Sequence, residues 1–383
     1  MNAKIKIVCD NKIPFLQEVL EPFADVRYLP PAEINRDSVK DADALLIRTR
    51  TKCNAQLLDG SSVKFIGTAT IGFDHIDTKY CEFKNIKWAN APGCNSSSVM
   101  QYLASALVTL AKKRNLELNK LTIGIVGVGN VGSKVAKMSE LLGLNVLMND
   151  PPRMRAEGKS GFVELDKLVS ESDVITFHVP LIREEIDKTF HLADEHFFAK
   201  FNGKKILINT SRGEVVDTSA LKNAIQKGTV NACVLDVWEN EPGIDCKLLQ
   251  MVDIATPHIA GYSADGKANG TSVCVRAVSS FFDLGIQPDW YPAELPKPES
   301  PEKFLIDCKS KSTQEILTEV ILNTYKILDD DKILRNSVET FEKQRGHYPV
   351  RREFPYYSIE TRNCEPAVFD ALAKLGFRTE RNE

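Results

Sequence analysis

Residues 121–132, Leu-Thr-Ile-Gly-Ile-Val-Gly-Val-Gly-Asn-Val-Gly, decide the fold. An apolar, β-branched run leads directly into three glycines, a helical pattern follows, and a second short apolar run ends at Asp150. This order of strand, tight turn, helix, strand and acid is typical of a dinucleotide-binding βαβ unit. Gly127 permits the sharp turn, Gly129 lets the backbone approach a pyrophosphate, and Gly132 lets helix and strand pack closely.

Other positions of this unit also point to a nucleotide. The N–H groups near Asn130 and Val131, at the helix start, would face the phosphates with the helix dipole in their favour. Asp150 lies 18 residues past Gly132, where a carboxylate can bind the adenosine ribose hydroxyls and favour NAD over NADP. The alternative interpretation is a βαβ unit whose glycines serve only packing.

Length and composition narrow the class of protein. With 383 residues, the chain suffices for two or three domains of about 100–200 residues each. A net charge of -3 argues against a nucleic-acid or anionic-membrane binder. No apolar run approaches the roughly 18 residues of a transmembrane helix, and residues 1–10 are a strand pattern rather than a signal peptide. Nine cysteines without a C-x-x-C pair predict reduced thiols in a cytoplasmic protein, with no disulfides and no metal site.

Strand patterns alternate with helical patterns before the glycines as well, which predicts a second parallel α/β sheet. We expect strands at residues 4–9, 25–29, 43–47 and 64–70, and a helix at 13–23. Because ligands gather at the carboxyl ends of parallel strands, residues 48–51 and 68–72 are candidate ligand loops. Solvated turns are the alternative, and for Arg48 or Arg50 alone that alternative is at least as good.

The predicted domains are joined by two long helices and a linker. An amphipathic helix over residues 99–113 leads into the glycine unit, and a helix over 263–285 returns toward the first domain. A polar surface loop is expected at 153–161. Five prolines between residues 287 and 304 predict a stiff linker. Beyond it, helices at 313–328 and 366–375 and a strand at 356–359 predict a small appended domain, whose modest size favours burial against a partner subunit.

Three later strand patterns end in residues that can carry chemistry. Arg212, Glu241 and His258 each follow one of them, so they are expected at one edge of the sheet, beside the nicotinamide. A histidine can take the proton of a hydroxyl as hydride leaves, and a carboxylate beside it orients the ring. An arginine fork can bind a substrate carboxylate bidentately. As a set they indicate oxidation of a 2-hydroxy acid; singly, each is more often structural. His75, His178, His191 and His196 are interpreted as structural or solvated.

Four motifs resemble the D-isomer-specific 2-hydroxyacid dehydrogenase family over about residues 1–285. They are Gly-Val-Gly-Asn-Val-Gly132, Asn-Thr-Ser-Arg-Gly213, Asp-Val-Trp-Glu-Asn-Glu-Pro242 and Thr-Pro-His-Ile-Ala-Gly-Tyr262. The resemblance implies two doubly wound parallel-sheet domains with a small α+β C-terminal domain. They are a flavodoxin-like substrate domain (1–95 with 264–286), a Rossmann NAD-binding domain (96–263) and a dimerisation domain (287–383).

One branch of this family is matched by further residues. They are Ile-Gly-Thr-Ala-Thr-Ile-Gly-Phe-Asp-His-Ile-Asp77, Ala-Pro-Gly-Cys-Asn95, His-Ile-Ala-Gly-Tyr262 and the C-terminal extension. The resemblance implies NAD-linked oxidation of 4-phospho-D-erythronate, a phosphorylated 2-hydroxy acid, to its 2-oxo acid on the route to pyridoxal phosphate. It also implies a cytoplasmic homodimer.

The resemblance assigns roles position by position. Arg212 and Glu241 are similar to catalytic residues, and His258 is similar to the proton-transfer residue. Positions that match substrate contacts are Thr49, Thr70 and Tyr262, with threonine at 49 where serine is more usual. Arg351 and Arg352 are candidate phosphate ligands. Positions that match cofactor contacts are Asn130, Val131, Asp150, Val179, Thr210, Ser211, Arg212, Asp236 and Gly261.

Three alternatives stay open. One gives the C-terminal segment a separate partner, and the other two concern the activity. Another enzyme of the family, such as a phosphoglycerate dehydrogenase, would keep Arg212, Glu241 and His258 and differ in its substrate loops. A non-enzymatic corepressor that senses NAD could be built on the same scaffold. An NADH-production assay discriminates between them.

Overall fold

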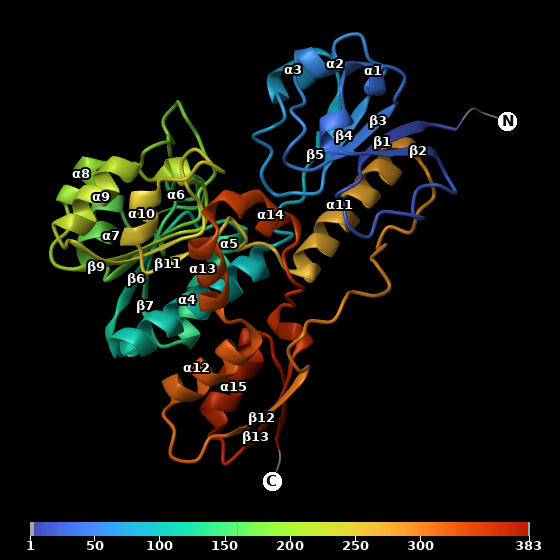
Figure 1. Cartoon of the computed structure of the whole chain (residues 1–383). Coiled ribbons are helices and arrows are strands. Elements are labelled where there is room, and N and C mark those ends of the chain that lie inside the picture. Colours follow the sequence, from blue (N-terminus) through green and yellow to red (C-terminus); the bar gives the residue numbers. More distant parts are fainter. Residues whose placement is uncertain (1–3, 159, 382–383) are drawn as a thin grey trace. The chain divides into compact units, whose positions relative to one another are not determined.

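The computed structural model describes residues 4–158 and 160–381. The chain forms two compact units, one of residues 1–95 with 263–296 and one of residues 96–262 with 297–383. The C-terminal segment, residues 297–383, therefore packs with the glycine-containing unit (Figure 1).

The first unit contains a five-stranded parallel sheet in the order β2-β1-β3-β4-β5, which is the flavodoxin-like order. The expected fold of this region is confirmed. Its strands are β1 (Lys6–Asp10), β2 (Asp25–Leu29), β3 (Ala44–Ile47), β4 (Phe65–Thr68) and β5 (Lys87–Ala89). Its α-helices are α1 (Arg36–Val39), α2 (Ala55–Leu58), α3 (Thr78–Phe83) and α11 (Ala264–Phe282).

The helix expected over residues 13–23 is wrong, because this stretch forms a series of turns. Phe15 and Glu18 adopt left-handed φ angles of 61° and 67°, which a right-handed helix excludes. The carboxylate of Glu21 accepts hydrogen bonds from the amides of Glu18 (3.0 Å) and Leu20 (3.1 Å). Side-chain acceptors of this kind offer the backbone an alternative to helical hydrogen bonds.

The second unit contains a six-stranded parallel sheet in the order β11-β10-β9-β8-β6-β7. After β6 the chain adds β7 on one side of that strand and then β8 to β11 on the other side. The strand order therefore reverses between β6 and β8, which is where doubly wound sheets bind ligands. The strands are β6 (Thr122–Val126), β7 (Asn145–Asn149), β8 (Val174–Phe177), β9 (Lys205–Asn209), β10 (Val230–Leu235) and β11 (Ile254–Ala255). The helices are α5 (Asn130–Leu141), α6 (Pro151–Glu157), α7 (Leu165–Glu171), α8 (Glu195–Ala199), α9 (Thr218–Gln226) and α10 (Cys246–Met251).

The surface loop expected over residues 153–161 is also wrong, since most of it is helix α6; residue 159 lies outside the described residues. Asp150 caps this helix by accepting a hydrogen bond from the amide of Arg153. Pro151 occupies the first helical position, where a missing N–H costs nothing. The two prolines end the strand and start a helix at the same point.

Helix α4 (Ser96–Arg114) is longer than expected, and it has no solvent-facing side over residues 101–111, which are all buried. Its apolar face packs on the β6 side of the unit, and its polar face is covered by the C-terminal segment. Three buried side chains donate hydrogen bonds to that segment: Ser98 Oγ to Glu353 Oε1 (2.8 Å), Gln101 Nε2 to Arg352 O (2.9 Å) and Ser105 Oγ to Tyr325 O (2.8 Å). The polar residues that suggested a solvent-facing side are thus part of an internal interface.

The C-terminal segment adds a three-stranded parallel sheet in the order β12-β13-β14. The expected helix over 313–328 is divided at Tyr325, whose extended φ of -153° separates α12 from α13. The helix expected at 366–375 is confirmed. The elements are β12 (Lys303–Asp307), α12 (Thr313–Thr324), α13 (Ile327–Asn336), α14 (Phe341–Gly346), β13 (Ser358–Arg362), α15 (Pro366–Leu375) and β14 (Arg378–Arg381).

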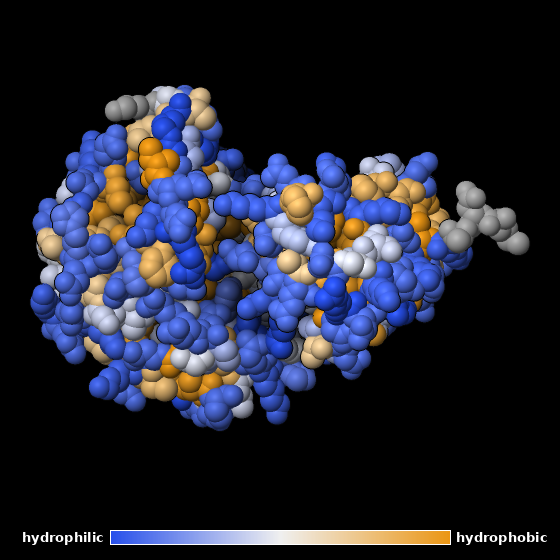
Figure 2. Space-filling model, turned by 90° about the horizontal axis from the view of Figure 1, so that it is seen from above, coloured by the Kyte–Doolittle hydropathy of each residue, from blue (hydrophilic) through white to orange (hydrophobic). Residues whose placement is uncertain are grey.

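Among the described residues, no helix has both the length and the apolar character needed to cross a membrane. On the face that Figure 2 shows, hydrophobic residues lie in patches among hydrophilic ones. All nine cysteines are free thiols.

Candidate functional site

The glycine loop, residues 127–132, has a different steric reason for each of its glycines. Gly127 has a left-handed φ of 86°, and a Cβ there would lie 2.6 Å from the carbonyl oxygen of His178. A Cβ on Gly132 would lie 2.0 Å from the carbonyl oxygen of Gly127. A Cβ on Gly129 would meet nothing within 4 Å, so this backbone faces open space. The loop is tight on its inner side and open where a ligand can approach.

The start of α5 forms one side of this open space. Its N-cap is Gly129, which has no side chain to satisfy the first amides of the helix, those of Asn130, Val131 and the residues after them. Uncapped N–H groups at a helix N-terminus are an anion site. The predicted phosphate contacts therefore have suitable geometry. Val179, another predicted cofactor residue, lies against the turn, since its Cγ1 would be 2.7 Å from a Cβ on Gly127.

Asp150 ties the end of β7 to the glycine loop. Its Oδ2 accepts the amide of Val128 at 2.8 Å and its Oδ1 accepts the amide of Arg153 at 3.0 Å. A carboxylate has about four lone-pair positions, so two remain for ribose hydroxyls. The guanidinium of Arg153 makes a bidentate pair with Glu157, with both distances at 2.7 Å. An arginine near this position can accept the 2′-phosphate of NADP, and here the pairing with Glu157 opposes that use.

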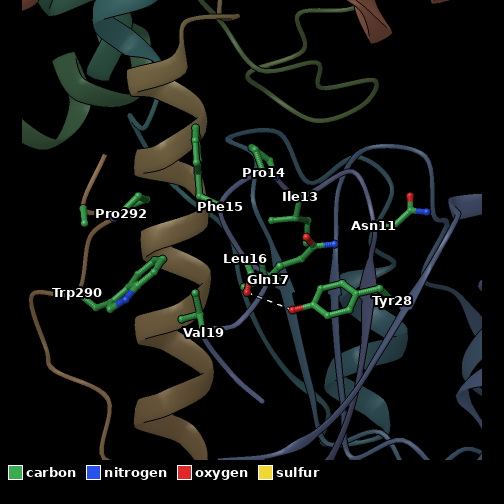
Figure 3. A pocket seen from close by; sticks show the side chains of 11 residues that line it. Asn11, Ile13, Pro14, Phe15, Leu16, Gln17, Val19, Tyr28, Trp290 and Pro292 are labelled. Atoms are coloured by element: carbon green, nitrogen blue, oxygen red, sulfur yellow. Dashed lines mark hydrogen bonds between the residues drawn. The ribbon is translucent and has the colours of Figure 1, made fainter. Parts of the chain in front are cut away.

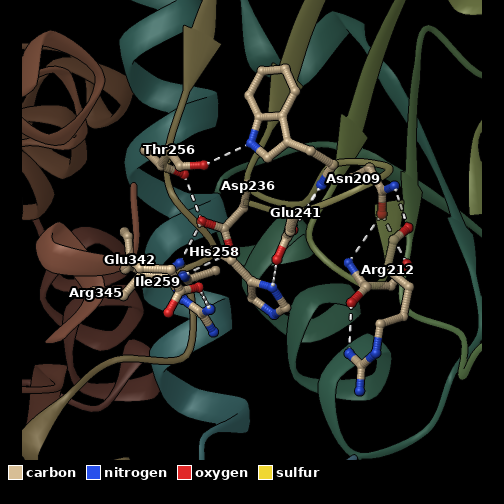
Figure 4. Close-up of polar contacts among 12 residues, drawn as sticks. Asn209, Arg212, Asp236, Glu241, Thr256, His258, Ile259, Glu342 and Arg345 are labelled. Carbon is tan, nitrogen blue, oxygen red and sulfur yellow. Dashed lines mark hydrogen bonds and ion pairs between the residues drawn. The ribbon is translucent and has the colours of Figure 1, made fainter. Parts of the chain in front are cut away.

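Arg212, Glu241 and His258 follow β9, β10 and β11, which are neighbours in the sheet, so all three lie at one edge (Figure 4). His258 and Glu241 are in contact, with 2.8 Å between Nδ1 and Oε2. Because an ionised carboxylate only accepts hydrogen bonds, Nδ1 carries the hydrogen and Nε2 is left to exchange a proton. The ring is 30% exposed, so Nε2 can be reached by a substrate.

Glu241 is held in its charged form. Burial raises the pKa of its carboxyl, but the charge and hydrogen bond of His258 and the amide of Trp238 outweigh burial, so the pKa lies below its ordinary value. The Trp238 amide donates to Oε1 at 2.9 Å, and this second contact fixes the carboxylate plane. Glu241 can therefore orient the imidazole and stabilise its charged form.

The loop that presents Arg212 is folded by Asn209. Asn209 donates from Nδ2 to the carbonyl oxygen of Arg212 (2.8 Å) and accepts from the amide (3.0 Å) and hydroxyl (2.9 Å) of Ser211. The Ser211 side chain is thus used within the loop. The buried hydroxyl of Thr210 has no hydrogen-bond partner in the described part of the chain, which suits its predicted cofactor contact.

The His258 loop, residues 256–262, is held by Asp236, a predicted cofactor residue that is 1% exposed. Its carboxylate accepts hydrogen bonds from the Thr256 hydroxyl (2.6 Å) and from the amides of Ile259 (2.8 Å) and Ala260 (2.9 Å). His258 has a left-handed φ of 57°, a conformation that costs a residue with a side chain about 1–2 kcal/mol. Contacts beyond the loop must therefore hold it; the cofactor role of Asp236 and of Gly261 stays a prediction.

The predicted substrate residues Thr49 and Thr70 follow β3 and β4, which are neighbours in the first sheet. Thr70 Oγ1 donates to the carbonyl oxygen of Gly72 (2.9 Å), so Thr68 must be the donor in the 2.7 Å bond between the two hydroxyls. The Thr68 hydrogen is then used, so His75 Nε2 must donate in its 3.1 Å contact with Thr68. The carbonyl oxygen of Gly72 thus fixes the donors of all three hydrogen bonds, because it takes the hydrogen of Thr70. The Thr70 oxygen is left able only to accept a further hydrogen bond.

The C-terminal segment contributes Arg345 and Tyr348, which the sequence did not single out, beside the predicted phosphate ligands Arg351 and Arg352. The third predicted substrate residue, Tyr262, packs edge-on against Tyr348, with ring centres 6.0 Å apart. The guanidinium of Arg345 lies 5.7 Å from the centre of the Tyr262 ring, and its charge also lowers the pKa of Glu241. Arg351 is buried against the His258 loop, and the guanidinium of Arg352 lies 4.3 Å from the ring centre of Tyr356. No local pattern marks Arg345 or Tyr348, because the contacts that each makes with Tyr262 join residues distant in sequence.

Three of the four histidines interpreted as structural or solvated, His75, His178 and His191, have protein partners, and His196 is exposed. Burial lowers the pKa of His178 to about 3, which keeps it neutral. His191 lies between Glu239 (2.7 Å) and Asp217 (3.4 Å). Within residues 4–158 and 160–381, no group of three potential ligands could hold a metal ion.

The first unit contains a pocket of about 480 Å³ (Figure 3). It is lined by the turns after β1, by β2 and by the linker, with Phe15, Tyr28 and Trp290 as its aromatic members. None of its lining residues is charged or belongs to the predicted site. It therefore adds nothing to the chemistry at the strand ends.

Comparison with known families supports the nucleotide-binding interpretation. The family model of the D-isomer specific 2-hydroxyacid dehydrogenase, NAD binding domain, matches residues 99–260. A domain of unknown function matches residues 295–376. An erythronate-4-phosphate dehydrogenase of Bacteroides thetaiotaomicron is 51% identical over 356 residues, covering 93% of this chain and 99% of the relative. One of Porphyromonas gingivalis is 42% identical, covering 95% of this chain and 97% of the relative.

Solved structures show the same fold. The D-lactate dehydrogenase of Aquifex aeolicus, complexed with NAD and lactic acid, is similar with a TM-score of 0.61 at 30% identity, covering 72% of this chain and 95% of that one. The NAD-dependent formate dehydrogenase of Staphylococcus aureus has a TM-score of 0.61 at 23% identity, covering 76% of this chain and 100% of that one.

Proposed function

The chain belongs to the erythronate-4-phosphate dehydrogenases, within the D-isomer specific 2-hydroxyacid dehydrogenase family, and we propose that it oxidises 4-phospho-D-erythronate to (R)-3-hydroxy-2-oxo-4-phosphooxybutanoate with NAD. The product would be an intermediate of pyridoxine 5′-phosphate (vitamin B6) biosynthesis. The observation that carries the proposal is the 2.8 Å contact between His258 and Glu241, at the strand end next to that of Arg212.

The residues at the edge of the sheet fit NAD. The open side of Gly129 and the uncapped start of α5 suit a pyrophosphate, and the two unused lone-pair positions of Asp150 suit ribose hydroxyls. The hydroxyl of Thr210, which has no hydrogen-bond partner among the described residues, suits a polar cofactor group. When bound, NAD would supply the acceptor for the hydride that leaves C2 of the substrate.

His258 is the proposed proton acceptor. Its Nε2 removes the proton from the C2 hydroxyl, while Nδ1 keeps its hydrogen bond to Glu241. Glu241 remains ionised because its pKa is low, so it stabilises the imidazolium that forms. Arg212 binds the substrate carboxylate through its planar guanidinium and favours the developing carbonyl.

The first unit would recognise the rest of the substrate through Thr49 and Thr70. The Thr70 hydroxyl already donates to Gly72, so it can only accept a hydrogen bond from a ligand. A substrate hydroxyl is a donor of that kind, whereas a phosphate or carboxylate is not. We therefore assign Thr70 to a hydroxyl of the sugar acid, and Tyr262 to another part of it.

The decisive experiment is an NADH-production assay on the purified full-length chain with a series of 2-hydroxy acids. We expect the highest kcat/KM with 4-phospho-D-erythronate and a large loss for D-erythronate without the phosphate. Preference for 3-phosphoglycerate would favour the phosphoglycerate dehydrogenase alternative. NADH binding without turnover of any 2-hydroxy acid would favour the corepressor alternative and would contradict an enzymatic role.

We further propose a homodimer formed through residues 287–383, as a third domain beside the substrate and NAD-binding domains. Leu305 on β12 and Leu328 and Ile333 on α13 are about half exposed, and a partner subunit would bury them. Sedimentation of the full chain should give twice its mass of 42.7 kDa, and a monomer would contradict this proposal. Nine free thiols are compatible with the reducing cytoplasm, where we place the enzyme.

A further inference from the structure

The backbone of the His258 loop is held from two opposite sides. On one side, the buried carboxylate of Asp236 accepts the amides of Ile259 and Ala260. On the other side, Nη2 of Arg351 donates to the carbonyl oxygens of Ile259 (3.1 Å) and Ala260 (2.5 Å). The N–H and C=O groups of the two residues that follow His258 are thus each hydrogen-bonded to a charged side chain. Charge-assisted hydrogen bonds of this kind are the stronger ones.

Arg351 comes from the C-terminal segment and is 4% exposed. Its guanidinium lies 4.5 Å from the ring centre of Tyr325 and 5.7 Å from that of Tyr348. The hydroxyls of both tyrosines donate to Asp330, at 2.7 and 2.8 Å. Aromatic faces and nearby carboxylates stabilise a buried cation, so this cluster keeps the guanidinium in one orientation.

The hydrogen bonding of Arg351 is concentrated on the His258 loop. Within the described part of the chain, its Nε and Nη1 are buried without a hydrogen-bond partner. A buried guanidinium that uses only one nitrogen is costly, and a residue selected only to dock two surfaces could be apolar. The two carbonyl contacts are therefore the feature that an arginine supplies at this position.

We propose that Arg351 is a positioning residue, which holds residues 259–260 so that His258 keeps its left-handed backbone and its contact with Glu241. This inference rests on the proposed function, in which His258 accepts the substrate proton. It gives the segment matched by the domain of unknown function a role in the catalytic site of its own chain. Arg351 then acts through His258 and does not contact the substrate phosphate.

Arg335 provides a matched control in the same segment. Its Nη1 and Nη2 donate to the carbonyl oxygens of Leu249 (2.5 Å) and Val252 (2.8 Å). It is therefore a second arginine that ties the C-terminal segment to backbone carbonyls of the same unit. These two carbonyl partners precede β11, and its third partner, Asp331, which its Nε contacts at 2.9 Å, belongs to α13, so all three lie outside the His258 loop. Loss of Arg335 tests docking of the segment, and loss of Arg351 tests docking together with loop position.

The experiment compares full-length wild type, Arg351→Met, Arg351→Lys and Arg335→Met. Thermal unfolding and circular dichroism first establish which variants are folded. Hydrogen–deuterium exchange then reports on the amides of residues 256–262. Steady-state kinetics with 4-phospho-D-erythronate give kcat, KM and the pH profile, and NADH fluorescence gives cofactor affinity.

In Arg351→Met we expect the amide hydrogens of residues 256–262 to exchange faster than in wild type. We also expect kcat to fall on the order of 10²-fold, the usual consequence of a small misplacement of a reacting group. KM and NADH affinity should change little, and the pH at which kcat falls to half should move. Arg351→Lys should recover part of kcat, since an ammonium can still reach one carbonyl. Arg335→Met should keep wild-type exchange in this loop and nearly wild-type kcat.

Three outcomes would overturn the inference. Equal changes in Arg351→Met and Arg335→Met would reduce Arg351 to a docking residue. A raised KM with an unchanged kcat would make it a substrate ligand. If Arg351→Lys and folded Arg351→Met both kept the wild-type kcat and the wild-type amide exchange in residues 256–262, the hydrogen bonds of Arg351 to this loop would have no role in positioning His258. Failure of the wild type to oxidise any 2-hydroxy acid would instead contradict the proposed function, and the exchange data would still decide whether Arg351 orders the loop.

Discussion

The glycine loop and the His258 loop face the same edge of one sheet, but they are held in place by opposite means. The glycine loop, residues 127–132, is shaped by missing side chains, since a Cβ at Gly132 would lie 2.0 Å from a neighbouring carbonyl oxygen. The His258 loop, residues 256–262, is shaped by added side chains, the buried charges of Asp236 and Arg351. A backbone that must approach a cofactor is specified locally, whereas a side chain that must be aligned is specified from a distance.

The largest effect is expected from a pair of glycine substitutions that test the first half of this contrast. Gly132→Ala places a methyl group against the Gly127 carbonyl and should destabilise the fold by about 1–3 kcal/mol or more and abolish NADH binding. Gly129→Ala meets open space, so the fold should persist while NADH binding weakens. Thermal unfolding and NADH fluorescence measure both. Equal stability of the two variants would show that close packing is not the reason for Gly132.

His258→Gln tests whether the second loop exists to align a proton acceptor. An amide cannot take up a proton at neutral pH, so kcat should fall by about 10²–10⁴-fold. NADH affinity should stay close to wild type, because the glycine loop is unchanged. Turnover near that of wild type would exclude His258 as the proton acceptor.

Glu241→Gln should have a smaller effect on rate and a clear effect on pH dependence. A neutral amide no longer stabilises the imidazolium, so the acid limb of kcat/KM should move to lower pH. The pKa of Glu241 is lower in the folded protein than the value of about 4.3 expected in the unfolded chain. Ionised Glu241 therefore stabilises the folded wild type at pH values above about 4.3, and this stabilisation is lost as the pH falls through the lower folded pKa. The stability difference between wild type and variant should therefore shrink on acidification. An unchanged pH–rate profile would argue against coupling to His258.

The smallest effect is expected at the ribose end of the cofactor site. Asp150→Ala removes the charge that would repel a 2′-phosphate and leaves Arg153 nearby, so the preference for NAD over NADP should narrow on the order of tenfold, or about 1.4 kcal/mol. Glu157→Ala is the companion variant, because it releases the Arg153 guanidinium from its bidentate pair. Kinetics with both cofactors measure the ratio. Equal use of NAD and NADP by the wild type would contradict the role given to Asp150.

Where prediction from the sequence was wrong, side-chain hydrogen bonds that apolar periodicity does not report decided the outcome. The expected helix over 13–23 is replaced by turns that Glu21 stabilises through backbone amides. Helix α4 has the expected position, but its polar residues are internal because the C-terminal segment accepts their hydrogen bonds. Periodicity reports which residues avoid water, and it cannot tell a solvent-facing side from one covered by a polar interface.

The sequence by itself determined the parallel sheets, the glycine loop and the order in which Arg212, Glu241 and His258 follow neighbouring strands. These properties depend on residues that are close in sequence and on the rule that parallel strands end at a common edge. Only the tertiary structure decided how His258 is held. Arg351 reaches the carbonyl of Ala260 across 91 residues of chain, and no local pattern encodes a contact whose partners meet only after the C-terminal segment has packed on α4.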